Sequence, residues 1–444
     1  MLLAISYGFA FTWSVRAALA MLVATVFTFL MARFGGDSGS RQRAQAAFFL
    51  GITVLALYLA FFKITAVLPF GRMGRLAFPL GLSYYTFKLM SYMIDVYWGK
   101  MEPARSFTQF ASAIAFFPQM AAGPIQRPAD FLPQLPPSRS AVGMGFSRLV
   151  WGLAKKILIA DNLAPTVNYV FGHIHGLHGA GLLAGFYLFP LQMYADFSAL
   201  TDVALGIGMM FGIQGPENFN RPFTASSISS FWRRWHMSLT NWLADYLFTP
   251  LRMATRSAGT AGLALSITLN MLAVGLWHGL TWGYFIFGLL NALYLVGDVL
   301  SARSRTAFWK ARPQLEILGV WAGWLLTIHL FFLAMVFFRA RAVADAAWLL
   351  GNAWSGLGTI RLDLSQLAAQ VGSHSLLLGL GGFAILELAE RFRPDAWWGR
   401  VEPTVPGWAR WAVRSVIVVC VAGGFFLLTV RPGMQESPFL YQVF

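Results

Sequence analysis

Two histidines, each preceded by a tryptophan, are the residues of this 444-residue sequence best suited to chemistry. His236 lies in the basic stretch FWRRWHMSL, and His278 lies inside a long apolar run. An ionisable residue at membrane depth is costly, so it is a candidate functional residue. In a channel that holds little water, a histidine can act as a general base that deprotonates a hydroxyl, whose oxygen then attacks an acyl group. The sequence therefore predicts acyl transfer, with His278 and His236 as catalytic residues.

Polar and aromatic neighbours are predicted to support the two histidines. Residues 231–246 are expected to form one helix, opened by Ser229 or Ser230 as N-cap. Asn241 on this helix can orient a histidine or stabilise an oxyanion. The predicted supporting residues are Asp196, Asp202, Arg233, Arg234, Trp235, Asn241 and Trp277.

Asp196 and Asp202 are the only charges in the apolar run 187–213. A buried carboxylate without a partner costs several kcal/mol, so each is expected to have one. The nearest predicted partners are the arginines and the histidine of residues 231–246, such as Arg233 for Asp196. A structural pairing that pins one helix to another is as good an interpretation as a functional one.

Other catalytic classes lack their motifs. The sequence has no Gly-x-Ser-x-Gly elbow, no Gly-x-x-x-x-Gly-Lys phosphate loop and no cysteine near a histidine. His173, His175 and His178 have a spacing that can bind a metal weakly, but neither carboxylate nor cysteine accompanies them. They are predicted to lie in a loop at the membrane surface, and no metal or bound cofactor is expected.

Composition indicates the fold class. The chain is 57% hydrophobic and 11% charged, which excludes a soluble multidomain protein. Because a spanning helix needs roughly 20 mostly apolar residues, the sequence predicts an all-α polytopic membrane protein with about ten to twelve spans and shorter re-entrant or interfacial helices. The charge-free runs are 17–31, 44–62, 107–126, 257–297, 317–338, 364–386 and 415–430.

Three segments are predicted to depart from simple spans. Prolines and glycines break residues 116–128, which indicates a re-entrant element beside a tunnel. Residues 143–161 are expected to form an interfacial amphipathic helix. Lys88 and Asp95 share a helix face, which fits either an interfacial helix with an aromatic belt or a functional role. His329, in a continuous apolar run, is expected to be a packed, hydrogen-bonded helix residue.

The formal charge of +15 comes mainly from arginines between apolar runs. Basic loops beside spans report orientation, and no nucleic-acid partner is expected. The N-terminus has no basic region or small-residue cleavage site, so a removed signal peptide is not expected. The single thiol, Cys420, permits no disulfide within the chain.

Several stretches together resemble a known family. They are GLSYYTFKLMSYMIDVYWGK, FFPQMAAGPIQRP, LQMYADFSALTDVALGIGMMFGI, NFNRPFTASSISSFWRRWHMSLTNWLADYLFTPL, NMLAVGLWHGLTWGYFIFGLLNALYL and SPFLYQVF. The sequence resembles the membrane-bound O-acyltransferase superfamily, in particular its bacterial alginate O-acetyltransferase branch. The resemblance implies one transmembrane domain over residues 1–444, with helices around a central tunnel and a catalytic core at about 80–300.

The resemblance also implies roles for particular residues. His278 takes the place of the near-invariant histidine of the family, and His236 takes that of the second histidine. Asp196 and Asp202 fall on the aspartates of another family segment. The sequence departs from the family pattern at Ala195 before the first aspartate, and a further family histidine is absent.

By resemblance, the chain takes acetyl from cytoplasmic acetyl-CoA and passes it through the bacterial inner membrane to an exported polysaccharide. The transfer is made directly or through a periplasmic acetyltransferase partner. D-alanyl or other acyl transfer from a carrier-protein thioester is the alternative within enzymes. An ion- or proton-coupled transporter is the alternative of another class, although no repeated halves are visible.

Charge predicts sidedness. Residues 34–43, 301–312 and 391–414 are expected to be cytoplasmic, because Lys and Arg near span ends bias a loop to that side. On a Cys420→Ala background, a cysteine at Ser304 is expected to resist an impermeant thiol reagent added from the periplasmic side. Labelling from that side would show that the topology is the reverse of the one predicted, and the predicted direction of acyl transfer would then be wrong as well.

Overall fold

The computed structural model describes residues 1–37, 39–67, 81–137, 141–355, 360–392 and 406–408. These residues form helices and turns without any strand, which confirms the all-α prediction. The predicted span 415–430, with Cys420, lies outside them. By internal contacts the chain divides into two compact units. Unit 1 comprises Met1–Phe146, Ala204–Glu217 and Ser238–Met253, and unit 2 comprises Ser147–Val203, Asn218–Met237 and Ala254–Phe444. The expectation of one domain stays a prediction.

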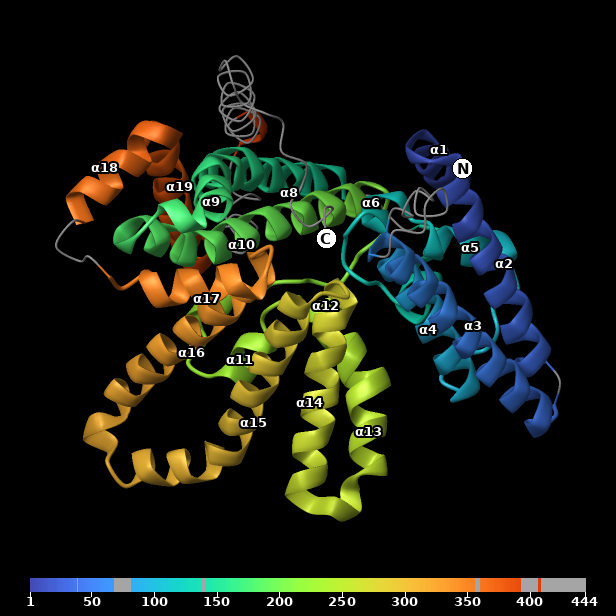
Figure 1. Ribbon diagram of the computed structural model, residues 1–444. Helices are drawn as coiled ribbons and strands as arrows, with labels where there is room; N and C mark the ends of the chain where they lie inside the picture. The colour runs from blue at the N-terminus through green and yellow to red at the C-terminus, as the bar shows by residue number, and fades with distance from the viewer. Residues whose placement is uncertain (38, 68–80, 138–140, 356–359, 393–405, 409–444) are drawn as a thin grey trace. The chain divides into compact units, whose positions relative to one another are not determined.

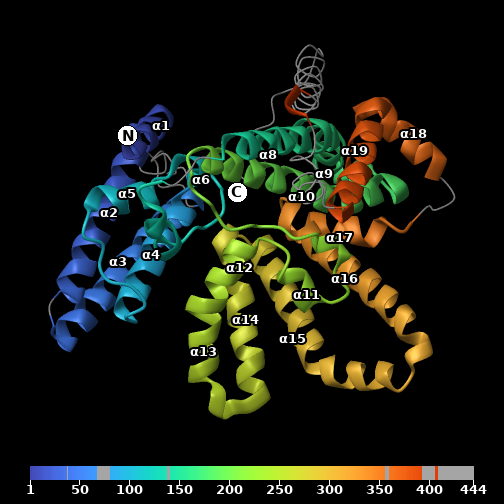
Figure 2. The same ribbon diagram turned by 180° about the vertical axis from the view of Figure 1, so that it is seen from behind.

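The helices distribute between the units as follows (Figures 1 and 2). Unit 1 contains α1 (Leu2–Trp13), α2 (Val15–Gly36), α3 (Arg41–Val67), α4 (Leu82–Tyr97), α5 (Phe107–Ile114), α6 (Phe117–Met120) and α7 (Pro128–Phe131). Unit 2 contains α9 (Asp161–Gly172), α11 (Ile228–Trp232), α14 (Gly259–His278), α15 (Trp282–Lys310), α16 (Glu316–Arg339), α17 (Val343–Asn352), α18 (Ile360–Val371) and α19 (Ser373–Phe392). Four helices have residues in both units: α8 (Val142–Ala154), α10 (Gly179–Met210), α12 (Met237–Leu243) and α13 (Thr249–Ala254).

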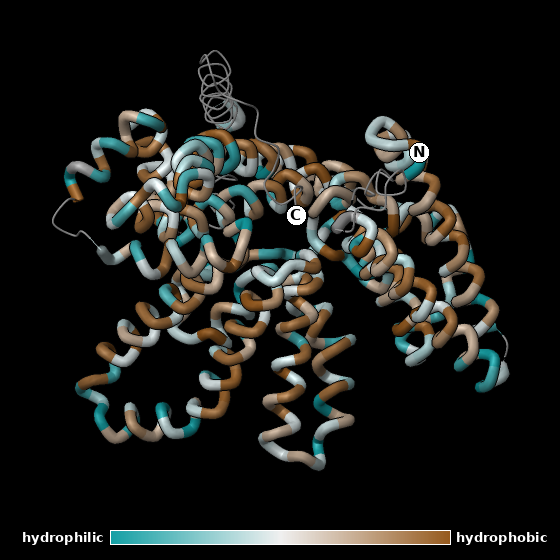
Figure 3. The backbone as a smooth tube through the Cα atoms, in the orientation of Figure 1, coloured by the Kyte–Doolittle hydropathy of each residue, from teal (hydrophilic) through white to brown (hydrophobic). Residues whose placement is uncertain are grey.

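Five helical segments of the described chain are long and apolar enough to cross a membrane. They are Val15–Gly36, Arg41–Thr65, Arg256–His278, Trp282–Lys310 and Pro313–Arg339, and Figure 3 shows the apolar residues along them. The run 257–297 forms two helices, as predicted. The run 364–386 is broken instead, because Gly372 takes a left-handed φ of 82° and the two flanking segments meet at 98°. The total of about ten to twelve spans stays a prediction.

Helix α4 packs beside α2 and α3 in unit 1 and is enclosed by protein (Figure 1). Every residue from Leu82 to Asp95 is buried. Lys88 Nζ donates to Gln119 Oε1 at 3.1 Å, and Tyr246 Oη donates to Asp95 Oδ2 at 2.7 Å. The interpretation of α4 as an interfacial helix is therefore wrong, because both of its charged side chains bond to other parts of unit 1.

The break at residues 116–128 is confirmed. Pro118 opens the four-residue helix α6, and the chain then runs without helix to α7. Gln119 Nε2 donates to Gln126 Oε1, and Gln126 Nε2 donates to the Gln214 carbonyl, both at 2.7 Å. The Ile125 backbone nitrogen donates to Ser238 Oγ at 3.0 Å. Both side-chain amides and this backbone group are thus bonded within unit 1, which fits the burial in protein expected of a broken segment. Re-entry without crossing stays a prediction.

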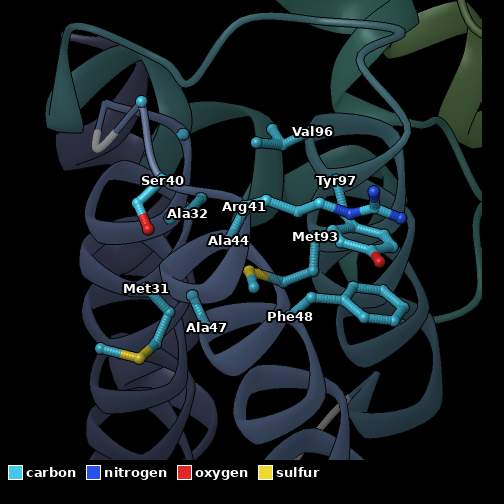
Figure 4. A pocket seen from close by; sticks show the side chains of 13 residues that line it. Met31, Ala32, Ser40, Arg41, Ala44, Ala47, Phe48, Met93, Val96 and Tyr97 are labelled. Atoms are coloured by element: carbon cyan, nitrogen blue, oxygen red, sulfur yellow. The ribbon is translucent and has the colours of Figure 1, made fainter.

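A cavity of about 260 Å³ opens at one end of α2, α3 and α4 (Figure 4). Met31, Phe48 and Met93 line its apolar wall, and Arg41 and Tyr97 lie at its edge. None of the predicted site residues is among those that line it. The cavity is accordingly a feature of unit 1 and gives no support to the histidine prediction.

The α14–α15 hairpin of unit 2 positions His278. Thr281 caps α15 by accepting a hydrogen bond from the Tyr284 backbone nitrogen. Gly275 and Gly288 let the two helices approach closely, since a Cβ at Gly275 would lie 2.3 Å from the Tyr284 carbonyl oxygen. His278 therefore sits at the end of a helix whose spacing from its neighbour is fixed by glycine.

Gly275→Ala is expected to destabilise the protein in detergent by about 1–3 kcal/mol, because the new methyl group meets backbone that cannot move cheaply. Gly297→Ala on α15 is the matched control, since a Cβ there meets no atom within 4 Å. That change should leave thermal stability equal or slightly higher, because alanine favours helix. Equal melting temperatures for the two variants would contradict the close packing.

Candidate active site

His236 lies in a turn that interrupts the helix predicted for residues 231–246. Helix α11 ends at Trp232 and α12 begins at Met237. The N-cap of α11 is Ser227, whose side chain accepts from the Ser230 backbone nitrogen at 3.1 Å. His236 has a φ of 45°, a left-handed conformation that a helix cannot contain. The prediction of one helix opened by Ser229 or Ser230 is therefore wrong.

Two backbone hydrogen bonds hold this turn against residues 218–220. The Asn220 nitrogen donates to the Arg234 carbonyl at 3.0 Å, and the Met237 nitrogen donates to the Asn218 carbonyl at 2.8 Å. These bonds replace helical ones and enclose His236. Local helix propensity is overridden by contacts with a segment earlier in the chain.

The His236 imidazole is only 2% exposed and lies in a polar and aromatic setting. Its Nδ1 is 3.3 Å from Asn218 Oδ1, and its ring meets Phe197 edge-on at 4.7 Å between centroids. Burial lowers the pKa of His236 to about 3. Its turn lies outside the five candidate spans. His236 is therefore neutral at physiological pH and can accept a hydrogen bond, whereas a general base works best with a pKa near the working pH.

His278, the last residue of α14, lies in an aromatic cluster of unit 2. Its ring centroid is 4.8 Å from that of Phe338 on α16 and 5.9 Å from that of Tyr284 on α15. The imidazole is half-buried. Three apolar helices thus converge on one ionisable side chain.

Trp277 contacts both histidines. Its ring centroid is 5.8 Å from that of His236 and 4.7 Å from that of His278. His236 and His278, which are far apart in the sequence, therefore both contact the indole ring of Trp277. Trp277, predicted as a supporting residue, is the element that joins the two candidate catalytic groups.

The other predicted supporting residues of the turn have different surroundings. Trp235 stacks on Phe231 with ring centroids 5.6 Å apart and lies 5.1 Å from Phe331, so it packs the turn against α11 and α16. Arg233 is exposed, and Arg234 Nη1 donates to Thr224 Oγ1 at 2.8 Å. Asn241 is an exposed residue of α12 in unit 1. Its orienting role stays a prediction.

The partners of the two aspartates differ from those predicted. Asp196 Oδ1 is 2.8 Å from Lys156 Nζ, and Asp202 is 3.0 Å from Arg148 Nε and 2.6 Å from Lys155 Nζ. The pairing of Asp196 with Arg233 is therefore wrong. Both aspartates point from α10 towards α8 and the π-helical segment Lys155–Ala160 that follows it.

These ion pairs also correct the interpretation of residues 143–161. Lys155 and Lys156 are buried, and Arg148 is partly buried. The polar side of the predicted interfacial helix faces protein and not the membrane surface. Gly152 permits this contact, since a Cβ there would lie 2.7 Å from the Ala199 carbonyl oxygen of α10.

Sequence reasoning missed several residues that position the site. Asn218 bonds His236, and Thr201 on α10 bonds Asn218. Asp298 on α15 accepts from the Ser229 backbone nitrogen at 2.9 Å and fixes the start of α11. Asp298 could have been found as a lone acid in an apolar helix, whereas Asn218 carries no such signal.

Other histidines have structural contacts. His329 Nε2 is 3.1 Å from Tyr187 Oη, and His329 Nδ1 is 2.7 Å from the Leu325 carbonyl, which confirms a hydrogen-bonded helix residue. His175 pairs with Asp345 at 3.0 Å. The described part of the chain contains no group of three or more His, Cys, Asp or Glu side chains placed to hold a metal ion.

The five apolar spans, three of which meet at His278 in unit 2, define a polytopic, all-α membrane protein with ionisable residues among its apolar helices. Comparison with known proteins gives the class. The profile of the membrane-bound O-acyltransferase family matches residues 104–338. A Pseudomonas aeruginosa protein named "Probable alginate O-acetylase AlgI" is 33% identical over 82% of this chain and 71% of its own length.

More distant relatives have related names. A Helicobacter pylori peptidoglycan O-acetyltransferase is 28% identical over 83% of this chain and 76% of its own length. A Bacillus subtilis teichoic acid D-alanyltransferase is 27% identical over 64% of this chain and 76% of its own length. The chain belongs to the membrane-bound O-acyltransferase family and is a multi-pass membrane O-acyltransferase. Membership favours acyl transfer over the transporter alternative.

Asp196→Ala is expected to lower the stability of the detergent-purified protein by about 1–3 kcal/mol, because it removes one of the two carboxylates that pair with the buried Lys156 and leaves Asp161 at 2.9 Å. Glu102→Ala is the matched control, since its pair with Arg105 is 85% and 92% exposed. Exposed pairs contribute little. An Asp196→Ala protein as stable as its parent but inactive would make Asp196 catalytic and not structural.

Proposed function

We propose that this enzyme transfers acetyl from acetyl-CoA across the bacterial inner membrane for O-acetylation of an exported polysaccharide. The relatives named as alginate O-acetylases, which cover most of the chain, support an acetyl donor and a polysaccharide acceptor. The acceptor is reached directly or through a periplasmic acetyltransferase partner. The charge of the loops supports entry of the donor from the cytoplasm.

The observation that carries the proposal is the contact of Trp277 with both His236 and His278. Acyl transfer between two bound substrates needs ionisable groups close together and little water around them. His236 is buried and His278 is half-buried among aromatic rings. This is the surrounding in which a neutral imidazole can take a proton from a hydroxyl.

The proposed step is a direct exchange. His278 takes the proton of the acceptor hydroxyl, and the oxygen forms a bond to the thioester carbonyl carbon. The carbon–sulfur bond then breaks, and the imidazolium returns the proton to the departing thiolate. The products are an acetyl ester and free coenzyme A thiol. His236, which also contacts Trp277, supports this step.

D-alanyl transfer is the second candidate, supported by the relatives named as teichoic acid D-alanyltransferases. The same exchange then takes place with a carrier-protein thioester. Presenting both donors to the purified protein separates the candidates. Consumption of acetyl-CoA with release of thiol supports the first, and turnover of only the D-alanyl carrier thioester supports the second.

His278→Ala is expected to reduce acyl transfer by about 100-fold or more while the protein still inserts in the membrane, because an essential base is lost. His236→Ala is expected to be damaging as well, with a residual activity if its role is to orient. The measurement is thiol release by protein purified in lipid nanodiscs, in the presence of a polysaccharide acceptor.

His329→Gln is the matched control for these variants. It replaces a histidine of an apolar helix in the same unit, and a glutamine keeps a hydrogen-bonding group near Tyr187. Its activity should stay close to that of the parent. Near-parental activity of a folded His278→Ala protein would refute the assignment of the base.

A further inference from the structure

The His236 side chain ends a chain of hydrogen bonds that begins on α10. Thr201 Oγ1 is 3.1 Å from Asn218 Nδ2, and Asn218 Oδ1 is 3.3 Å from His236 Nδ1. Thr201 is 2% exposed, Asn218 is 0% exposed, and His236 is 2% exposed. The imidazole is thus connected to a long helix through one amide.

Asn218 is held by its backbone as well as its side chain. Its carbonyl accepts the hydrogen bond from the Met237 nitrogen at 2.8 Å. The same residue therefore binds the backbone directly after His236 and the imidazole of His236. A residue fixed at both points can determine how the ring is placed.

The orientation of the Asn218 amide sets the direction of both side-chain bonds. An asparagine side chain has an NH₂ donor and a carbonyl acceptor. Because Nδ2 donates to Thr201, Oδ1 faces His236 and accepts from it. The proton of the neutral imidazole must then be on Nδ1, which leaves the lone pair on Nε2.

Several charged groups near His236 are engaged elsewhere. The titratable groups on the elements around it are Asp196 and Asp202 on α10, Glu217 and Arg221 in the segment of Asn218, Arg233 and Arg234 in its own turn, and His278 on α14. The two aspartates pair with lysines, and Arg234 bonds Thr224. Burial is the cause that lowers the pKa of His236, so the neutral ring persists through the physiological range.

We infer that Asn218, held by Thr201, is a positioning residue that fixes His236 as the Nδ1–H tautomer, with Nε2 as an acceptor for an O–H or N–H group of a bound substrate. This inference rests on the proposed function for the substrate, whereas the tautomer is a property of the folded chain. It also defines the role of His236. An Nε2 that carries no proton cannot donate to an oxyanion, so His236 is not part of an oxyanion hole.

The tautomer can be measured directly. Full-length protein labelled with ¹⁵N-histidine in detergent micelles gives separate nitrogen signals for protonated and unprotonated ring positions. His236→Gln identifies the signals of His236 by difference. At neutral pH the expected spectrum has a protonated Nδ1 and an unprotonated Nε2. A protonated Nε2 in the parent protein would overturn the inference.

Substitutions in the chain test whether Asn218 acts through His236. Thr201→Val removes the acceptor that orients the amide and is expected to lower kcat about tenfold, the effect of roughly one hydrogen bond. Thr201→Ser keeps the hydroxyl and should retain activity and tautomer. Equal activities and equal spectra for the two variants would contradict a role of Thr201 in orienting Asn218.

Asn218→Asp separates positioning from a structural role. A carboxylate beside Nδ1–H keeps the tautomer and raises the pKa of His236. The ¹⁵N signals of His236 report its own protonation, so their titration midpoint should move to higher pH in this variant. An unchanged midpoint in a folded variant would contradict the inference. If the parent protein transferred no acyl group from any donor, the proposed function would fail, while the ¹⁵N spectrum would still decide the tautomer.

Discussion

The left-handed backbone at His236 is the constraint on which the candidate site depends. Its φ of 45° costs about 1–3 kcal/mol for a residue with a side chain. Two backbone hydrogen bonds to residues 218–220 and the packing of Trp235 offset this cost. Without the break, residues 231–246 would continue as one helix and the imidazole would point elsewhere. Strain held in this way is common where a side chain must be aimed.

Helix α10 contributes side chains to two different polar interactions in unit 2. Thr201 serves the histidine through Asn218, whereas Asp196 and Asp202 bind cations of α8 and the π-helical segment after it. Buried ion pairs fix the register between elements more than they add stability. A π-helical turn places Lys155 and Lys156 beside α10, and such turns are frequent at functional sites. The ion pairs of Asp196 and Asp202 thus hold α10 in place, and Thr201 on α10 bonds Asn218, which in turn bonds His236.

Sequence reasoning predicted the helical fold, which the structure confirms. It also proposed both histidines as catalytic, which stays a prediction, and the structure places both beside Trp277. These predictions were possible because long apolar runs, and an ionisable residue inside such a run, can be recognised in the sequence alone. The partners of the aspartates were not predictable, since Lys156 lies forty residues before Asp196 and reads as part of an amphipathic face.

The break at His236 was missed for a related reason. Residues 231–246 have helical propensity, and the bonds that override it come from Asn218 and Asn220, in a separate segment. Asn218 begins one of the stretches that carry the family resemblance, but its residue type alone does not assign it a role. Only its burial between Thr201 and His236 identifies it as part of the site.

The central claim is that His236 and His278 form one centre around Trp277. A double-mutant cycle on single-turnover acyl transfer, with His236→Ala, His278→Ala and both together, tests it most directly. Residues that act as a unit are strongly non-additive. The account predicts that the double variant loses little more activity than the more damaged single variant. Losses that multiply in the double variant would mean that the two histidines act independently, and would contradict the account.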